Sequence, residues 1–145
     1  MAMKTSDRWY GCPVRFGAAA VGDAWSLAIL RDLIFMDARR YADFLRADEG
    51  IATNILAGRL VHLEKEGIIR KSPDPDHAGR HHYMLTEKGL ELVPVVLEIM
   101  AWSIKWDPQT EAPEGFRARL SADRAGLTAE ILARLRSGAA SVSFA

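Results

Sequence analysis

The sequence predicts a mostly helical α+β protein in which a three-helix core is followed by a two-stranded β-hairpin and by further helices. Residues 24–35 form an apolar run that is typical of a buried helix, and residues 52–66 repeat leucines at helical spacing. Residues 68–85 contain two short strand patterns around a turn rich in proline, aspartate and glycine. This order of elements indicates a winged helix-turn-helix.

Length and composition restrict the broad class of protein. The chain has 145 residues, of which 49% are hydrophobic and 26% charged, and this suits one folded domain with a real core. It has no apolar run of about 18 residues, no N-terminus resembling a signal peptide and a single cysteine. We therefore expect a cytoplasmic protein without a membrane partner. Its formal net charge of zero argues against indiscriminate nucleic-acid binding.

Local signals define the first helices. Cys12 and Pro13 open a short apolar pattern, and Asp23 is placed to cap the helix over residues 24–35. A third, short helix is expected over residues 40–45. Its inner face carries residues at i, i+3 and i+4, namely Tyr41, Phe44 and Leu45.

The helix over residues 52–66 has two distinct faces. Its buried stripe consists of Leu56, Leu60 and Leu63. At about 100° per residue, the opposite face carries Asn54, Gly58, Val61 and Lys65. Gly67 is a normal stop for such a helix. We expect the polar face to be open to solvent.

The hairpin follows directly. Strands at residues 68–72 and 80–85 enclose a polar turn at residues 73–79, and Thr86 then caps a further helix. All four histidines of the chain lie in the helix over residues 52–66 or in the hairpin. Below about pH 6.5 they would add positive charge there, so we expect the affinity for an anionic partner to rise.

The C-terminal part is predicted to be helical. Pro94 either kinks the helix after the hairpin or belongs to a first turn that begins later. Residues 107–115 form a break. One amphipathic helix is expected over residues 119–136, because apolar residues there are spaced by four.

Several short motifs occur in a fixed order along residues 9–106. They are Cys12-Pro13-Val14, Gly22-Asp23, Ile29-Leu30-Arg31-Asp32-Leu33, Arg40-Tyr41, Gly50-Ile51, Leu56, Arg59-Leu60, Leu63-Glu64, Gly67, Tyr83, Leu85-Thr86, Gly89, Leu92 and Trp102. With this spacing the chain resembles the HxlR-type family of winged helix-turn-helix transcriptional regulators, which are MarR-like. The resemblance implies a DNA-binding domain over residues 9–106 and a C-terminal helical extension and tail over residues 107–145.

The chain departs from the family pattern at four positions. Ala24, Tyr41 and His81 replace a lysine, a phenylalanine and an apolar residue that the family favours. Ala52 replaces a serine at the cap of the recognition helix, which costs about 0.5–2 kcal/mol of helix stability unless Thr53 takes over as the cap.

The resemblance implies a DNA-binding transcriptional regulator, more often a repressor, whose partner is double-stranded DNA. In such folds the recognition helix 52–66 enters the major groove and the wing 68–85 reaches the backbone. The candidates for base contacts are Thr53, Asn54, Ala57 and Gly58. The candidates for phosphate or wing contacts are Arg59, His62, Lys71, His77 and Arg80. Two alternatives stay open: Gly58 can be a tolerated weak spot, and Arg59 can belong to a salt bridge.

One winged helix covers too little DNA for good specificity, so we expect a homodimer on a (pseudo)palindromic operator with half-sites about 34 Å apart. The C-terminal helices of the fold are expected to serve dimerisation. Apolar residues at both ends of the domain exceed the needs of a three-helix core, namely Trp9, Tyr10, Phe16, Val96, Ile99 and Trp102.

Cys12 is the redox-sensing candidate, because the family resemblance places a sensor there, and Arg15 is near. Its alternative role is that of a small apolar residue at a dimer interface. A small-molecule or electrophile effector is a further possible partner. No cofactor is expected, and alternation along the strand separates His81 from His82, which disfavours a metal site.

Enzymatic activity is not expected. The sequence shows no Ser/His/Asp order, glycine-rich phosphate loop or paired carboxylates in an apolar setting. The alternative function is a winged-helix module for protein–protein contact without sequence-specific DNA binding, since a fold alone does not define a function.

Overall fold

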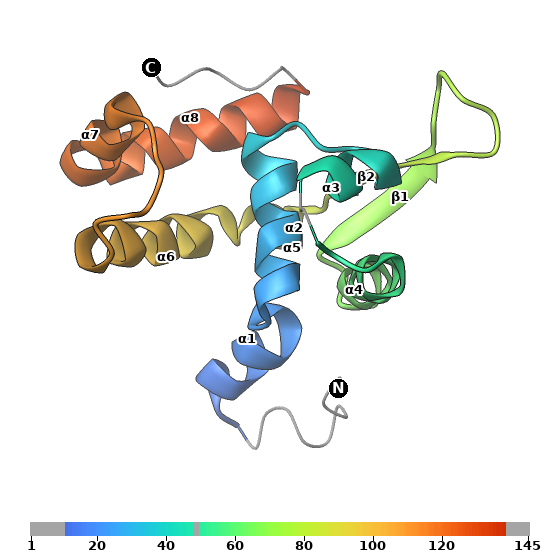
Figure 1. Ribbon diagram of the computed structural model, residues 1–145, viewed down its shortest axis with the longest axis horizontal. Coiled ribbons are helices and arrows are strands. Elements are labelled where there is room, and N and C mark those ends of the chain that lie inside the picture. Colours follow the sequence, from blue (N-terminus) through green and yellow to red (C-terminus); the bar gives the residue numbers. More distant parts are fainter. Residues whose placement is uncertain (1–10, 48–49, 139–145) are drawn as a thin grey trace. The chain divides into compact units, whose positions relative to one another are not determined.

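The computed structural model describes residues 11–47 and 50–138, and it confirms a mostly helical winged helix-turn-helix (Figure 1). Its contacts form two units that divide between Gly89 and Leu90. The elements are α1 (Pro13–Val21), α2 (Ala24–Phe35), α3 (Tyr41–Ala47), α4 (Thr53–Lys65), β1 (Ile69–Pro73), β2 (His81–Leu85), α5 (Glu87–Leu90), α6 (Val93–Trp106), α7 (Glu114–Ala122) and α8 (Arg124–Ser137).

The ends of α1 and α2 follow the local signals. Cys12 is the N-cap residue of α1, with proline in the first turn. Asp23 caps α2, because its Oδ2 accepts a hydrogen bond from the Ser26 N–H at 2.9 Å. Partial burial disfavours the ionised carboxyl, but the bonds from Ser26 and the charge of Arg59 outweigh it and lower the pKa of Asp23.

The core of the first unit lies between α2, α3, α4 and the hairpin. α2 contacts α3 and α4, and α4 contacts β1. The leucine stripe of α4 is buried as predicted, and Phe44 of α3 is fully buried. Tyr83 of β2 meets the Phe44 ring edge-on at 6.0 Å between centroids. The most deeply buried large apolar residues are Ile29, Leu30, Leu33, Ile34, Phe44, Leu56, Leu60, Leu63, Ile68 and Ile69.

The wing is the antiparallel pair β1–β2, in register Ile69↔Leu85 and Pro73↔His81. The Asp74 N–H donates to the Arg80 carbonyl at 2.9 Å and closes the loop between the strands. In Figure 1 this loop extends beyond α3 and α4. Each strand begins one residue later than the sequence pattern indicates, which is within the ordinary uncertainty of element ends.

The wing is anchored at its base by close backbone contact. The Thr86 Oγ1 accepts from the Gly89 N–H at 3.2 Å, so Thr86 caps α5 as predicted. A Cβ atom at Gly89 would lie 2.1 Å from the carbonyl oxygen of Ile68, so only glycine fits there. Gly67 ends α4 with φ +73°, as predicted for a helix stop.

The second unit packs α6, α7 and α8 together. Pro94 lies in the first turn of α6, which therefore begins later than the hairpin exit and is not kinked by the proline. The single helix expected over residues 119–136 is wrong, because the chain breaks at Asp123. The Asp123 carboxylate accepts from the Gly126 N–H at 3.0 Å and caps α8, so a local cap overrides the spacing of the apolar residues. No helix of the described chain is long and apolar enough to cross a membrane.

Candidate nucleic-acid interface

The face of α4 turned away from its leucines is open to solvent. All four residues predicted to meet base edges are exposed there: Thr53, Asn54, Ala57 and Gly58. Val61 is 53% exposed on the same side, one turn further along. A Cβ atom at Gly58 would meet no atom within 4 Å, so the space beside the helix is open at this position. This face offers hydroxyl, amide and methyl groups, the chemistry that base edges require.

The start of α4 is held by α3. Ala52 occupies the cap position and Thr53 is the first helical residue, so Thr53 does not replace the missing cap. Instead, the Tyr41 hydroxyl donates to the Thr53 carbonyl oxygen at 2.9 Å. This bond ties the first turn of the recognition helix to the preceding helix.

Two of the predicted phosphate contacts have partners inside the first unit. The Arg59 Nη1 lies 3.6 Å from the Asp23 Oδ1, which is the inter-element ion pair left open as an alternative. The His62 Nε2 lies 2.8 Å from the Ala20 carbonyl oxygen and is placed to donate to it. Both side chains are half-buried. Each would have to exchange a protein partner for a phosphate.

The wing carries the least neutralised cations. Lys71 and Arg80 are exposed, and neither forms an ion pair with a described carboxylate. Arg70 is also exposed on β1. His77 is half exposed, and its Nδ1 lies 3.6 Å from the Asp74 Oδ2. Positive charge on the wing is therefore concentrated on Lys71 and Arg80, with Arg70 as a further cation that the site prediction omitted.

A buried carboxylate at the start of the loop between β1 and β2 was missed by the sequence interpretation. The Asp74 side chain is fully buried, and the Arg40 Nε donates to its Oδ2 at 2.5 Å. The His82 Nε2 lies 3.3 Å from the Asp74 Oδ1. The hydrogen bond from Arg40 holds the pKa of Asp74 well below its usual range and raises the pKa of the guanidinium.

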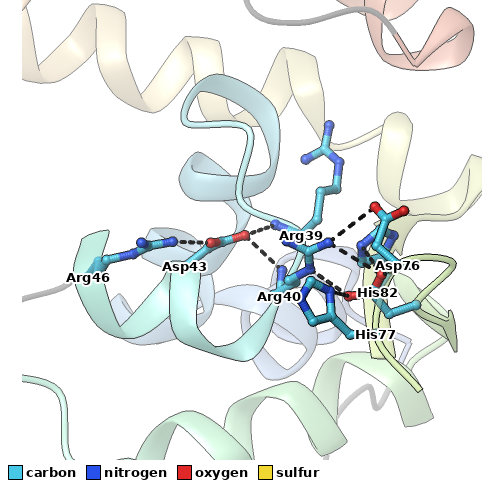
Figure 2. A network of polar contacts seen from close by, with 8 residues as sticks. Arg39, Arg40, Asp43, Arg46, Asp76, His77 and His82 are labelled. Carbon is cyan, nitrogen blue, oxygen red and sulfur yellow. Dashed lines mark hydrogen bonds and ion pairs between the residues drawn. The ribbon is translucent and has the colours of Figure 1, made fainter. Parts of the chain in front are cut away.

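A second carboxylate fixes the start of α3. The Asp43 Oδ2 accepts from the backbone N–H groups of Arg39 and Arg40, each at 3.0 Å, and the Arg46 Nη2 donates to its Oδ1 (Figure 2). Burial opposes ionisation of Asp43, but these bonds outweigh it and lower its pKa. The Tyr83 N–H also donates to the Arg39 carbonyl at 2.6 Å. The start of α3 and the wing are therefore joined by both backbone and side-chain bonds.

Cys12 is half-buried at the start of α1 and is a free thiol. The residues that the structure describes contain no group of three His, Cys, Asp or Glu side chains that could hold a metal ion. His82 points to Asp74 while His81 is exposed, as strand alternation predicts.

The apolar surface expected for dimerisation differs in part from the prediction. Val96 is buried within the second unit at 6% exposure, so its assignment to a surplus apolar surface was wrong. Trp9 and Tyr10 lie outside the described residues, and Phe16 is exposed. Helix α6 carries an exposed apolar stripe at spacings of four, three and four: Val95, Ile99, Trp102 and Trp106. Because this spacing is visible in the sequence, Val95 and Trp106 could have been found from it.

Known proteins share this arrangement. Residues 20–111 match the family model described as HxlR-like helix-turn-helix. Rv3095 of Mycobacterium tuberculosis, an uncharacterised HTH-type transcriptional regulator, is 33% identical over 108 residues, covering 74% of this chain and 67% of that protein. The crystal structure of PA1607 has a TM-score of 0.66 at 32% identity and covers 74% of this chain and 75% of its own. The redox regulator HypR in its reduced form has a TM-score of 0.58 at 29% identity, with coverages of 64% and 91%.

Proposed function

Because the chain belongs to the HxlR-like helix-turn-helix family and is a transcriptional regulator of the helix-turn-helix type, we propose that it acts as a repressor. In this proposal a homodimer binds a pseudo-palindromic operator in double-stranded DNA. The observation that carries it is the solvent-open face of α4 beside a wing whose cations form no ion pair with a described carboxylate. A helix with that face fits the major groove, and the wing reaches the neighbouring backbone.

Base choice is assigned to the first turns of α4. Asn54 can pair with an adenine edge, and Thr53 can bond a base or touch a thymine methyl. Gly58 and Ala57 leave room for the backbone to approach. Lys71, His77 and Arg80 supply contacts to the DNA backbone from the wing. Arg59 and His62 join them only after releasing Asp23 and Ala20, so we rank them below the wing residues.

The dimer is proposed to use the exposed stripe of α6. Two copies of a stripe with coiled-coil spacing can cover each other about a two-fold axis, and an operator with two half-sites has the same symmetry. Tryptophans at the centre of such a contact are the residues that most often dominate its binding energy. Trp102 and Trp106 are 67% and 66% exposed and are available for this role in the second unit.

Control of DNA binding through Cys12 is a further part of the proposal. HypR, which resembles this chain, is named as a redox regulator. With a single cysteine per chain, oxidation would form a bridge between two subunits or a mixed adduct with a small thiol. An electrophile effector would act at the same thiol, and control by a small-molecule effector is the alternative to control through Cys12. Full DNA affinity after peroxide, quinone or aldehyde treatment would remove this part.

Selection of bound sequences from random DNA tests the main proposal. We expect an enriched site with two-fold symmetry and a discrete, salt-sensitive complex in a mobility shift. Arg80→Ala should weaken binding to all sequences alike, while Asn54→Ala should relax the choice of one base. Enrichment of no site, with no shift at low salt, would favour a protein–protein contact module instead.

A further inference from the structure

A cleft of about 450 Å³ lies between the start of α3 and strand β2. Its lining residues are Arg40, Tyr41, Ala42, Arg80, His81 and Tyr83. His81 and Tyr83 lie on one face of β2, because side chains alternate along a strand. Tyr41 is bonded to the first carbonyl of α4, so the cleft adjoins the start of the recognition helix. It therefore lies between the two elements that carry the proposed function.

The charge of this cleft suits one monoanion. Its lining contains two arginines, one histidine and no carboxylate. Arg40 is bonded to the buried Asp74, and its Nη2 also lies 3.5 Å from the Asp76 Oδ2, so its charge is neutralised within the protein. Arg80 forms no ion pair with any carboxylate in the described ranges. One positive charge is therefore left without a partner, and His81 adds a second charge only when it is protonated.

Tyr83, which lines the cleft, carries a hydroxyl donor. The Tyr83 hydroxyl has no hydrogen-bond partner within the described parts of the chain. Burial raises the pKa of this phenol, so it stays a protonated donor at neutral pH. The Tyr41 hydroxyl already donates to Thr53, so Tyr41 contributes its ring as a wall.

We propose that this cleft seats one phosphodiester of the DNA backbone, held by the Arg80 guanidinium and the Tyr83 hydroxyl. The inference rests on the proposed function, and it adds a specific backbone position to it. In this proposal a DNA strand runs from the start of α4 to the wing over this cleft. A cation and a neutral hydroxyl donor together match the charge and the acceptor oxygens of a single diester. The volume leaves space for the adjoining sugar carbons.

Single neutral substitutions in the DNA backbone test this directly. The probe is the duplex selected above, made as a series in which one phosphate at a time is replaced by a methylphosphonate. For the wild-type protein we expect one position per half-site, between the major-groove contacts and the wing, where the affinity falls roughly tenfold. In Arg80→Ala and in Tyr83→Phe, a methylphosphonate at that position should cause little further loss of affinity, while methylphosphonates at the other positions should weaken binding as they do for the wild type.

Arg70→Ala is the matched control, because Arg70 is an exposed wing cation outside the cleft and pairs with Met84, so its side chain lies on the other face of the hairpin from Tyr83. It should weaken binding overall but leave the effect of the cleft-specific position intact. Tyr83→Phe keeps the ring against Phe44, so its unfolding midpoint should match that of the wild type. The proposal is overturned if Tyr83→Phe retains the wild-type response at every phosphate, or if Arg70→Ala abolishes the response at the same position. Sequence-specific binding without these effects would leave the proposed function standing, whereas no DNA binding at all would remove both.

Discussion

Replacing Gly58 by alanine should change folding stability and DNA affinity in opposite directions. Gly58 is exposed in the interior of α4, and a Cβ atom there would meet nothing within 4 Å. Alanine is favoured over glycine inside a helix by about 0.8–1.0 kcal/mol. With no steric clash to offset this gain, the free energy of unfolding should rise by about 1 kcal/mol, or about fivefold in the folding equilibrium.

The same methyl group should weaken DNA binding. If the backbone of α4 approaches the base edges at Gly58, a Cβ atom has to occupy that contact and push the helix outward. The loss should equal about one good base contact, or roughly tenfold in affinity. A glycine that is only a weak spot in the helix would give the stability gain without this loss.

Urea unfolding and fluorescence anisotropy with the selected duplex measure the two effects. Gly17→Ala is the matched control, because Gly17 lies inside α1 and a Cβ atom there would also meet no atom within 4 Å. It should raise stability and leave DNA affinity unchanged. Wild-type affinity in Gly58→Ala would refute a close approach at this position. A rise in stability for Gly17→Ala alone would show that α4 is not open at residue 58.

Three further predictions concern the ion pairs and the exposed stripe. Asp23→Asn keeps a good helix cap but frees Arg59 from its ion pair, so the free energy of unfolding should change by less than about 1 kcal/mol. The freed Arg59 should steepen the slope of log DNA affinity against log salt concentration by about one unit. An unchanged slope in a salt titration would contradict this prediction. The pKa of Asp74 is depressed in the folded protein, so ionised Asp74 stabilises the fold. This stabilisation is fully present above the unfolded pKa of about 3.9 and is lost progressively as the pH falls below that value. Asp74→Asn should therefore be less stable than wild type in urea at pH 7, and this difference should shrink at pH 3. Trp102→Ala should raise the dimer dissociation constant by at least about 30-fold in sedimentation without lowering the unfolding midpoint of the monomer, and a monomeric wild type at micromolar concentration would remove the dimer proposal.

The sequence alone determined the elements whose signals are local. The period of the leucines on α4 defined its buried and open faces, because side-chain direction in a helix depends only on position along it. Asp23, Gly67 and Thr86 marked helix ends, because caps act within one turn. The one helix predicted wrongly, over residues 119–136, failed where a second local signal, the cap at Asp123, competed with the apolar period. The assignments of single residues to bases and phosphates stay predictions.

Only the tertiary structure decided which charges are neutralised. Arg40 and Asp74 are 34 positions apart, and His62 and Ala20 are 42 positions apart, yet each pair is in hydrogen-bond contact. Arg59 likewise finds Asp23 on a different helix. Residues 52–85 contain five positive side chains (Arg and Lys) and four negative ones (Asp and Glu), but the sequence does not show which of them face each other. Pairing depends on distances of a few ångströms between segments far apart in the chain, and packing sets these distances. That packing leaves Arg70, Lys71 and Arg80 as cations of the wing without a described acidic partner.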